Sequence, residues 1–239
     1  MSYHESKPFQ FKQFAVAQSR SSMKVGTDAV LLGCWAEVKA AHRLLDVGTG
    51  NGVIALICAQ RNPSVSIRGI DIDKGSVHDA EFNFSNSPWS ERMETISGDF
   101  LGYSSDVKYD LIISNPPYFS DSIRASDPVR SKARHDDSLP ADKFMNHAAL
   151  LLNEDGIVSV IIPLNQLKRW MDAGRHAGLL PQRICHVFTL ADREASRVMV
   201  EFGCSGGSEP QMESLLIERK PGEFSEAYKQ LTRDFYTRW

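Results

Sequence analysis

The chain has few of the features that build disulfide frameworks, zinc sites or membrane spans. Its four cysteines stand far apart among 239 residues, with no Cys-x-x-Cys pair. We therefore expect them to be small buried hydrophobes, and we expect no metal site. No apolar run approaches the length of a transmembrane helix, and the sequence near Met1 is polar, unlike a secretory signal. These absences predict a cytoplasmic protein that does not contact a membrane.

Net positive charge is also lacking. There are 27 lysines and arginines against 30 aspartates and glutamates, which gives a net charge of −3 and a pI of about 6.2. This balance disfavours nonspecific nucleic-acid binding, which depends on excess cations that neutralise phosphates. Two basic clusters, at 119–135 and 219–238, are local exceptions. They either contact a nucleic-acid substrate or are solvated loop charges, and the sequence leaves both interpretations open.

Strand and helix patterns alternate along the chain without a linker or an internal repeat. The length suits one α/β domain. We expect a single domain, 1–239, with an N-terminal extension and helix at 1–35, a core at 36–204, and a strand and helix at 205–239. The last strands of the core have hairpin spacing instead of βαβ spacing. This predicts a mostly parallel sheet with an antiparallel end and helices on both faces.

Asn115-Pro116-Pro117-Tyr118 is the most distinctive motif. It directly follows an apolar run, 109–114, that predicts a strand. The prolines fix φ and favour an extended conformation at Asn115, so that its amide and the neighbouring carbonyls point in set directions. The flat ring of Tyr118 can stack on a base or an amide. Such a loop suits the binding of a planar amino group, although a proline-rich strand end without chemistry is the alternative.

A glycine-rich turn follows an earlier apolar run. Asp46, Gly48, Gly50 and Gly52 alternate with other residues before a helical pattern at 53–60. Glycines between a strand and a helix let the backbone approach a cofactor closely. The spacing differs from the Gly-x-Gly-x-x-Gly of dinucleotide sites, and a carboxylate in the turn itself would repel a diphosphate. A ligand with a cationic amino acid group fits this turn better.

The next two predicted strands each end in an acidic residue. Asp71 occupies the position from which a carboxylate accepts hydrogen bonds from ribose hydroxyls, and Asp73 is a competing acid with an equally good role as a helix N-cap. Asp99 can accept a hydrogen bond from an adenine amino group, and Phe100 can pack on its ring. A plain turn residue is the alternative for Asp99.

Near the N-terminus, Thr27 and Asp28 precede an apolar run. They predict a helix start at which these two residues supply the cap. The other interpretation is a role in closing over the amino acid end of a cofactor. Lys24 either contacts a ligand or is solvated.

In an open parallel sheet the carboxyl ends of the strands share one edge, so the glycine turn, Asp71, Asp99 and Asn115 are expected to converge on one crevice. This set, within residues 43–162, resembles class I S-adenosylmethionine-dependent methyltransferases. The resemblance implies a Rossmann-like fold with a seven-stranded sheet and S-adenosyl-L-methionine as the cofactor.

Four further stretches, 9–14, 23–33, 86–92 and 224–236, are similar to the tRNA1(Val) adenine-37 N6-methyltransferase family. The resemblance implies methylation of an anticodon-loop adenosine in tRNA. We expect no metal and no obligate protein partner, and a monomer is the default. The implied catalytic residues are Asn115, Pro116, Pro117 and Tyr118. The implied cofactor contacts are Lys24, Thr27, Asp46, Gly48, Gly50, Gly52, Asp71, Ile72, Asp99, Phe100 and Asn115.

Other functions stay open from the residues alone. Release-factor methyltransferases share the Asn-Pro-Pro-Tyr motif, because a glutamine amide offers the same planar amino group. A guanine N2-methyltransferase and a non-catalytic RNA-binding module are further alternatives. The intact glycines and Asn115 disfavour the non-catalytic module, and the glycine spacing disfavours a dehydrogenase.

Overall fold

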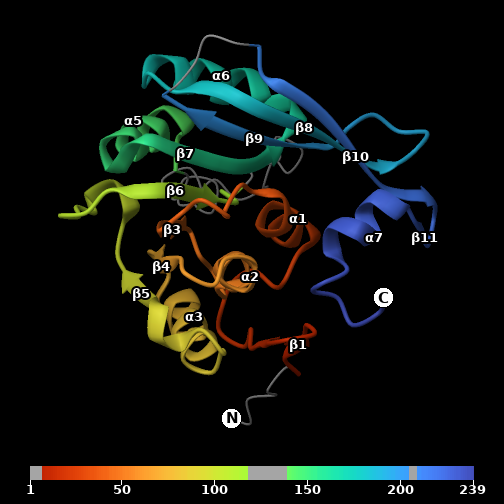
Figure 1. The fold of residues 1–239 in the computed structure, drawn as a ribbon, viewed down its shortest axis with the longest axis horizontal. Helices are drawn as coiled ribbons and strands as arrows, with labels where there is room; N and C mark the ends of the chain where they lie inside the picture. Colours follow the sequence, from red (N-terminus) through yellow and green to blue (C-terminus); the bar gives the residue numbers. More distant parts are fainter. Residues whose placement is uncertain (1–6, 118–138, 205–208) are drawn as a thin grey trace, which may run out of the picture.

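The computed structural model describes residues 7–117, 139–204 and 209–239, and a mixed sheet forms its centre (Figure 1). Its nine strands, in spatial order, are β11 (Glu223–Phe224), β10 (Gln211–Lys220), β8 (Leu180–Leu190), β9 (Arg197–Gly203), β7 (Leu152–Pro163), β6 (Tyr109–Ser114), β3 (Arg43–Val47), β4 (Ser66–Asp71) and β5 (Met93–Ser97). The run from β7 to β5 is parallel. β9 is antiparallel to both β7 and β8.

This topology confirms the mostly parallel sheet with an antiparallel end. The expected count of seven strands is wrong for the described residues, because β10 and β11 extend the sheet beyond β8. β10 pairs with β8 in parallel, and the short β11 then turns back antiparallel to β10. The strand that follows β9 in the chain, β10, therefore lies beside β8, on the side of β8 away from β9.

Helices cover both faces of the sheet (Figure 1). The first face carries α1 (Thr27–Trp35), α2 (Val53–Arg61), α3 (Lys74–Ser85) and α7 (Glu226–Thr232), and the second carries α5 (Ala141–Leu151) and α6 (Leu167–His176). Successive strand residues alternate between the two cores. Leu44 packs in the core of the first face, whereas Leu45 packs in that of the second. Burial on both faces explains why the central strands are continuous apolar runs.

The N-terminal hairpin and the last residues of the chain meet on the first face. The hairpin of β1 (Phe9–Gln10) and β2 (Ala15–Val16) is followed along the chain by α1. Phe11 forms an isolated antiparallel bridge with Tyr236, and their rings stack with centroids 5.8 Å apart. Among the helices in the described ranges, none is long and apolar enough to cross a bilayer.

The carboxyl ends of the parallel strands lie level with one another. Val47 is in register with Ile70 on one side and Ser114 on the other, and Asp71 is in register with Ser97. The chain order changes direction between β3 and β6, because β4 and β5 lie on one side of β3 and β6 and β7 on the other. Such a switch point is where open α/β sheets bind ligands.

Candidate active site

The glycine loop, residues 48–52, crosses the carboxyl end of β4. The N–H groups of Gly48 and Thr49 donate to the Ile70 carbonyl at 2.9 and 3.1 Å. Gly48 and Gly50 have φ values of +68° and +57°, in the left-handed region that suits glycine. A Cβ on Gly48 would meet no described atom within 4 Å, and one on Gly50 would meet only the Gly48 carbonyl, at 4.0 Å. These two glycines therefore border open space that a ligand can fill.

Gly52 has a different role from the one predicted. It is the N-cap of α2, with φ +80°. A Cβ at this position would lie 2.5 Å from the Phe84 ring of α3. The structure thus requires a glycine here for its positive φ and for the packing of α3 against the loop, and a contact of Gly52 with the cofactor stays a prediction.

Asp46 lies inside β3 and is fully buried, so our placement of it in the turn itself is wrong. Thr49 Oγ1 donates to its Oδ2 at 2.7 Å, while Oδ1 has no hydrogen-bond partner within the described ranges. Burial raises the pKa of Asp46 to about 7, against the lowering effect of the hydrogen bond from Thr49. A buried carboxylate with an unmatched oxygen favours a nearby cation or hydrogen-bond donor.

Asp71, the last residue of β4, fastens the glycine loop. Its Oδ2 accepts from the Gly50 N–H at 2.8 Å, and its Oδ1 accepts from the Asp73 N–H at 2.9 Å. Burial raises the pKa of this half-buried carboxyl, opposed by those two backbone hydrogen bonds. The next residue, Ile72, is 72% exposed and offers an apolar surface at the same strand exit.

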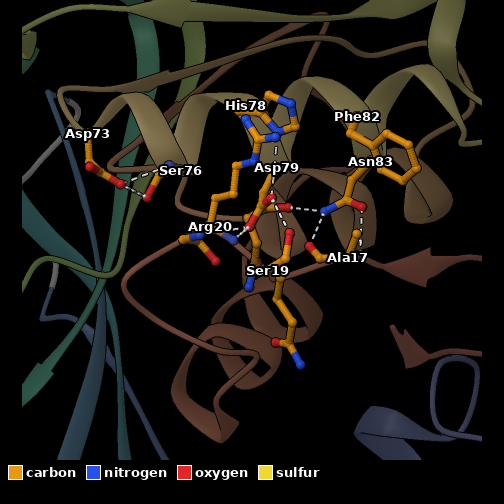
Figure 2. A network of polar contacts seen from close by, with 12 residues as sticks. Ala17, Ser19, Arg20, Asp73, Ser76, His78, Asp79, Phe82 and Asn83 are labelled. Carbon is orange, nitrogen blue, oxygen red and sulfur yellow. Dashed lines mark hydrogen bonds and ion pairs between the residues drawn. The ribbon is translucent and has the colours of Figure 1, made fainter. Parts of the chain in front are cut away.

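Asp73 caps α3. Its Oδ2 accepts from both the backbone N–H and the hydroxyl of Ser76, each at 2.8 Å (Figure 2). These hydrogen bonds lower the pKa of Asp73. The capping interpretation of Asp73 is confirmed. Asp71, at the end of β4, remains the candidate for binding ribose hydroxyls.

Asp99 and Phe100, after β5, point in different directions. Asp99 is exposed and accepts from the Leu101 N–H at 3.0 Å, which makes it the cap of a short 3₁₀ turn. Phe100 is only 5% exposed and packs against Phe144 and His147 of α5. Its ring thus belongs to the core of the second face, and little of it is open to a ligand.

The Asn-Pro-Pro-Tyr motif, which we call the acceptor loop, begins where β6 ends, next to β3. Ser114 Oγ donates to the Val47 carbonyl at 2.8 Å and joins the two strand ends. Asn115 is half-buried, Pro116 is buried and Pro117 is exposed. Tyr118 and the basic cluster at 119–135 lie outside the described residues. The strand exit at Asn115 is therefore confirmed, and the stacking role of Tyr118 stays a prediction.

The cap of α1 differs from the prediction. The helix does begin at Thr27, but Gly26 occupies the N-cap and no side chain caps the helix. Asp28 instead accepts from Arg197 Nε of β9 at 2.8 Å. Thr27 and Lys24 are exposed, and Lys24 Nζ donates to the Gln18 carbonyl.

Several cations of the second basic cluster, 219–238, interact with other side chains of the chain. Three of its cations form ion pairs: Arg219 with Glu223, Lys229 with Glu226, and Arg233 with Asp234. The Arg238 guanidinium lies over the rings of Phe224, Tyr236 and Trp239, at 4.2 to 4.7 Å from their centroids. The contact of this cluster with a nucleic acid stays a prediction.

Sequence comparison places these features in a known family. The model of the methyltransferase small domain matches residues 9–169. The chain is 42% identical to a tRNA1(Val) (adenine(37)-N6)-methyltransferase of Bacteroides thetaiotaomicron, over 95% of this chain and 96% of the relative. The chain belongs to this methyltransferase family. A Vibrio vulnificus relative with the same name is 36% identical over 97% of this chain and 96% of its own length.

Solved structures support the fold of this methyltransferase. A predicted O-methyltransferase from Agrobacterium tumefaciens superposes with a TM-score of 0.67 at 17% identity, covering 87% of this chain and 96% of that one. A ribosomal protein L11 methylase from Lactobacillus delbrueckii gives a TM-score of 0.55 at 20% identity, covering 79% and 83%. The expected Rossmann-like methyltransferase fold is therefore confirmed.

Sequence reasoning missed one part of the site. Residues 17–25 lie against α3 and the glycine loop, held by Asp79 and Asn83 (Figure 2). In the sequence, these contacts were indicated only by the spacing of Asp79 and Asn83, four positions apart on α3. The same spacing is common on solvated helix faces. Their partners lie 58 to 66 residues away along the chain for residues 17–21, so local patterns do not reveal them.

Proposed function

We propose that this chain transfers a methyl group from S-adenosyl-L-methionine to the exocyclic N6 of an adenosine in tRNA. The target proposed is the one for which its relatives are named, adenosine 37 of tRNA1(Val). The observation that carries the proposal is the meeting of Asn115, Asp71 and the glycine loop at the switch point between β3 and β6.

The described residues suit this cofactor. The open backbone at Gly48 and Gly50 would receive its amino acid part, and Asp46, buried beneath the loop with one unmatched oxygen, would ionise more readily beside the cationic amino group. Asp71 binds the ribose hydroxyls, and Ile72 and Asp99 border the adenine. When bound, S-adenosyl-L-methionine supplies an electrophilic methyl group on a sulfonium centre.

The acceptor loop must make a poor nucleophile react. The lone pair of adenine N6 is delocalised into the ring, so attack requires that it be localised. Asn115 Oδ1 and the Pro116 carbonyl accept the two amino hydrogens, which favours a pyramidal nitrogen. As positive charge develops on that nitrogen, these hydrogen bonds become charge-assisted and are worth about 1.5–3 kcal/mol each.

Orientation contributes more than either hydrogen bond. Holding two reacting groups in line supplies about 7–11 kcal/mol. Stacking of the base on Tyr118 adds about 1–3 kcal/mol of binding. The adenosine must be unstacked before it can enter the site, so a loop nucleotide is favoured over a paired one.

A glutamine amide in a release factor is the rival acceptor, because it needs the same two hydrogen-bond acceptors. The chain should be incubated with S-adenosyl-L-methionine labelled in the methyl group and, separately, with total tRNA, ribosomal RNA or release factors. We expect label only in tRNA, and digestion should release it as N6-methyladenosine. A tRNA1(Val) transcript with guanosine at position 37 is the matched control and should stay unlabelled. Label in protein alone would overturn the proposal.

A further inference from the structure

Two buried polar side chains on α3 have no role in the chemistry proposed above. Asp79 and Asn83 lie one turn apart on the helix and are only 2% and 3% exposed. Burying an amide or a carboxylate costs free energy unless hydrogen bonds compensate for the lost water. Their hydrogen bonds therefore show what the two residues are for.

Asp79 binds the backbone of residues 17–25, which we call the N-terminal strap. Its Oδ2 accepts from the N–H groups of Arg20 and Ser21 at 2.8 and 2.7 Å. Its Oδ1 accepts from the Ser19 hydroxyl at 3.4 Å (Figure 2). A carboxylate that receives several N–H groups holds a chain segment in place much as an N-cap holds a helix end.

Asn83 joins the strap to the glycine loop. Its Oδ1 accepts from the Ala17 N–H, and its Nδ2 donates to the Ala17 carbonyl and to the Asn51 carbonyl, all at 2.8 Å. One amide thus connects three elements: the strap and α3, as Figure 2 shows, and the loop that borders the cofactor space. Loss of this amide would leave three backbone groups without a partner.

Two further features place the strap close to the site. Asn51 Nδ2 donates to the Met23 carbonyl at 3.4 Å. Gly75, in the first turn of α3, leaves room for the strap, because a Cβ there would lie 2.6 Å from the Arg20 carbonyl. The strap therefore touches both the glycine loop and the helix that begins after Asp71.

We infer that Asp79 and Asn83 are positioning residues, which set the affinity for S-adenosyl-L-methionine by holding the N-terminal strap as a side wall of the cofactor site. The inference rests on the proposed function, since it concerns the same cofactor. The strap spans only nine residues between a two-stranded hairpin and α1. Its register against the glycine loop therefore depends on these two side chains.

Asn83→Ala tests the inference, with Asn62→Ala as the matched control. Asn62 is equally buried, at 2%, and also binds backbone groups, but it lies at the far end of α2 from the glycine loop. Calorimetric titration with S-adenosyl-L-methionine should give a dissociation constant roughly tenfold higher for Asn83→Ala and unchanged for Asn62→Ala. The catalytic rate at saturating cofactor should be nearly unchanged in both.

Gly75→Ala is a second variant in case Asn83→Ala folds poorly, because it displaces the strap while keeping both polar side chains. Trypsin provides a readout that needs no activity, since the strap contains Arg20 and Lys24. We expect faster cleavage there in Asn83→Ala and Gly75→Ala, and protection by cofactor in the unaltered chain. Equal affinities in Asn83→Ala, Gly75→Ala and the unaltered chain would overturn the inference alone. Failure of the unaltered chain to bind the cofactor would overturn the proposed function as well.

Discussion

The two halves of the sheet both carry charged side chains, but they use them differently. In the parallel half, from β7 to β5, the polar groups of the candidate site lie at or near the carboxyl ends of β3, β4, β5 and β6, and the ion pair of Arg68 with Glu94 inside β4 and β5 is exposed. In the half that contains β8, β9 and β10, the charged groups around Arg183 lie within the strands and are at least partly buried. Arg183 of β8 donates to Glu201 of β9 at 3.2 Å and to Glu213 of β10 at 2.7 Å, and its guanidinium lies 4.0 Å above the Trp35 ring.

We expect the polar groups near the strand ends to serve binding and catalysis, and the paired charges within β8, β9 and β10 to serve stability. Within the strands, the acids are paired: Trp35 Nε1 donates to Glu213 at 2.8 Å, and the Glu37 N–H donates to Glu201 at 2.7 Å. After β3, glycine backbone borders open space, and Asp46, the next-to-last residue of β3, keeps one buried oxygen without a partner in the described ranges. A change at the exits should therefore alter catalysis or binding, and a change in the paired cluster should alter folding.

The largest expected effect is that of Asn115→Ala. Removing one acceptor for the adenine amino group should lower the catalytic rate by about 10²–10³, by analogy with the loss of one oxyanion-hole group. The dissociation constant for the cofactor should stay nearly unchanged. Asn165→Ala, at the exit of β7, is the control and should retain full activity. A parallel loss of cofactor affinity in Asn115→Ala would mean that the acceptor loop is misassigned.

Asp46→Asn should change the dependence of stability on pH. The raised pKa of Asp46, about 7, means that the folded state favours the protonated carboxyl. Its stabilising contribution is complete below the unfolded-state pKa and is lost as the pH rises toward 7. Between about pH 5 and pH 8 the free energy of unfolding should fall by about 3 kcal/mol because of this group.

The asparagine variant should lack that fall, as measured by urea unfolding at the two pH values. Asp110→Asn is the control, because hydrogen bonds from Arg43, His42 and Asn153 hold the pKa of Asp110 low in spite of burial. Its contribution is lost only in more acidic solution, so this variant should keep the slope of the unaltered chain. Equal slopes for all three proteins would contradict the assigned environment of Asp46.

Arg183→Met should lower the free energy of unfolding by about 2–3 kcal/mol, because it leaves the buried Glu201 without its ion pair. Burial already raises the pKa of Glu201 against the effect of Arg183. Cofactor affinity should be unaffected. Arg175→Met breaks only an exposed pair with Asp172, which keeps its pair with Lys168, and should leave the free energy of unfolding almost unchanged. A change in cofactor affinity in Arg183→Met would break the separation of the two halves.

Gly50→Ala separates backbone strain from blockage of the site. The φ of +57° should cost about 1–2 kcal/mol of stability for any L residue. Gly222→Ala, with φ +81° in the β10–β11 turn, carries a similar strain, and its Cβ would meet no described atom within 4 Å. Both variants should lose similar stability, but only Gly50→Ala should weaken cofactor binding, as measured by titration. Equal binding in both would place the cofactor away from this loop.

The sequence predicted what depends on neighbours in the chain. The apolar run before Asn115 became β6 with the expected bounds, Tyr109–Ser114. The glycine turn lies between β3 and α2, and Asp71 ends β4. Apolar periodicity together with glycine and proline determines these features locally, so one sequence is enough to predict them.

What depends on distant partners was not predictable. Asp28 does not cap α1 because Arg197, 169 residues away, takes its carboxylate. Phe100 turns into the core because α5 presents Phe144 to it. Gly52 is required because Phe84 packs on the loop. In each case a local rule was overridden by a tertiary contact that cannot be read from spacing.

A crystal structure of the chain with S-adenosylhomocysteine tests the central claim most directly. The account predicts that the amino acid part lies against Gly48 and Gly50, that the ribose hydroxyls donate to Asp71, and that the sulfur faces Asn115 across the space of one amino group. A ligand bound at another edge of the sheet, or with its sulfur turned away from Asn115, would contradict the account.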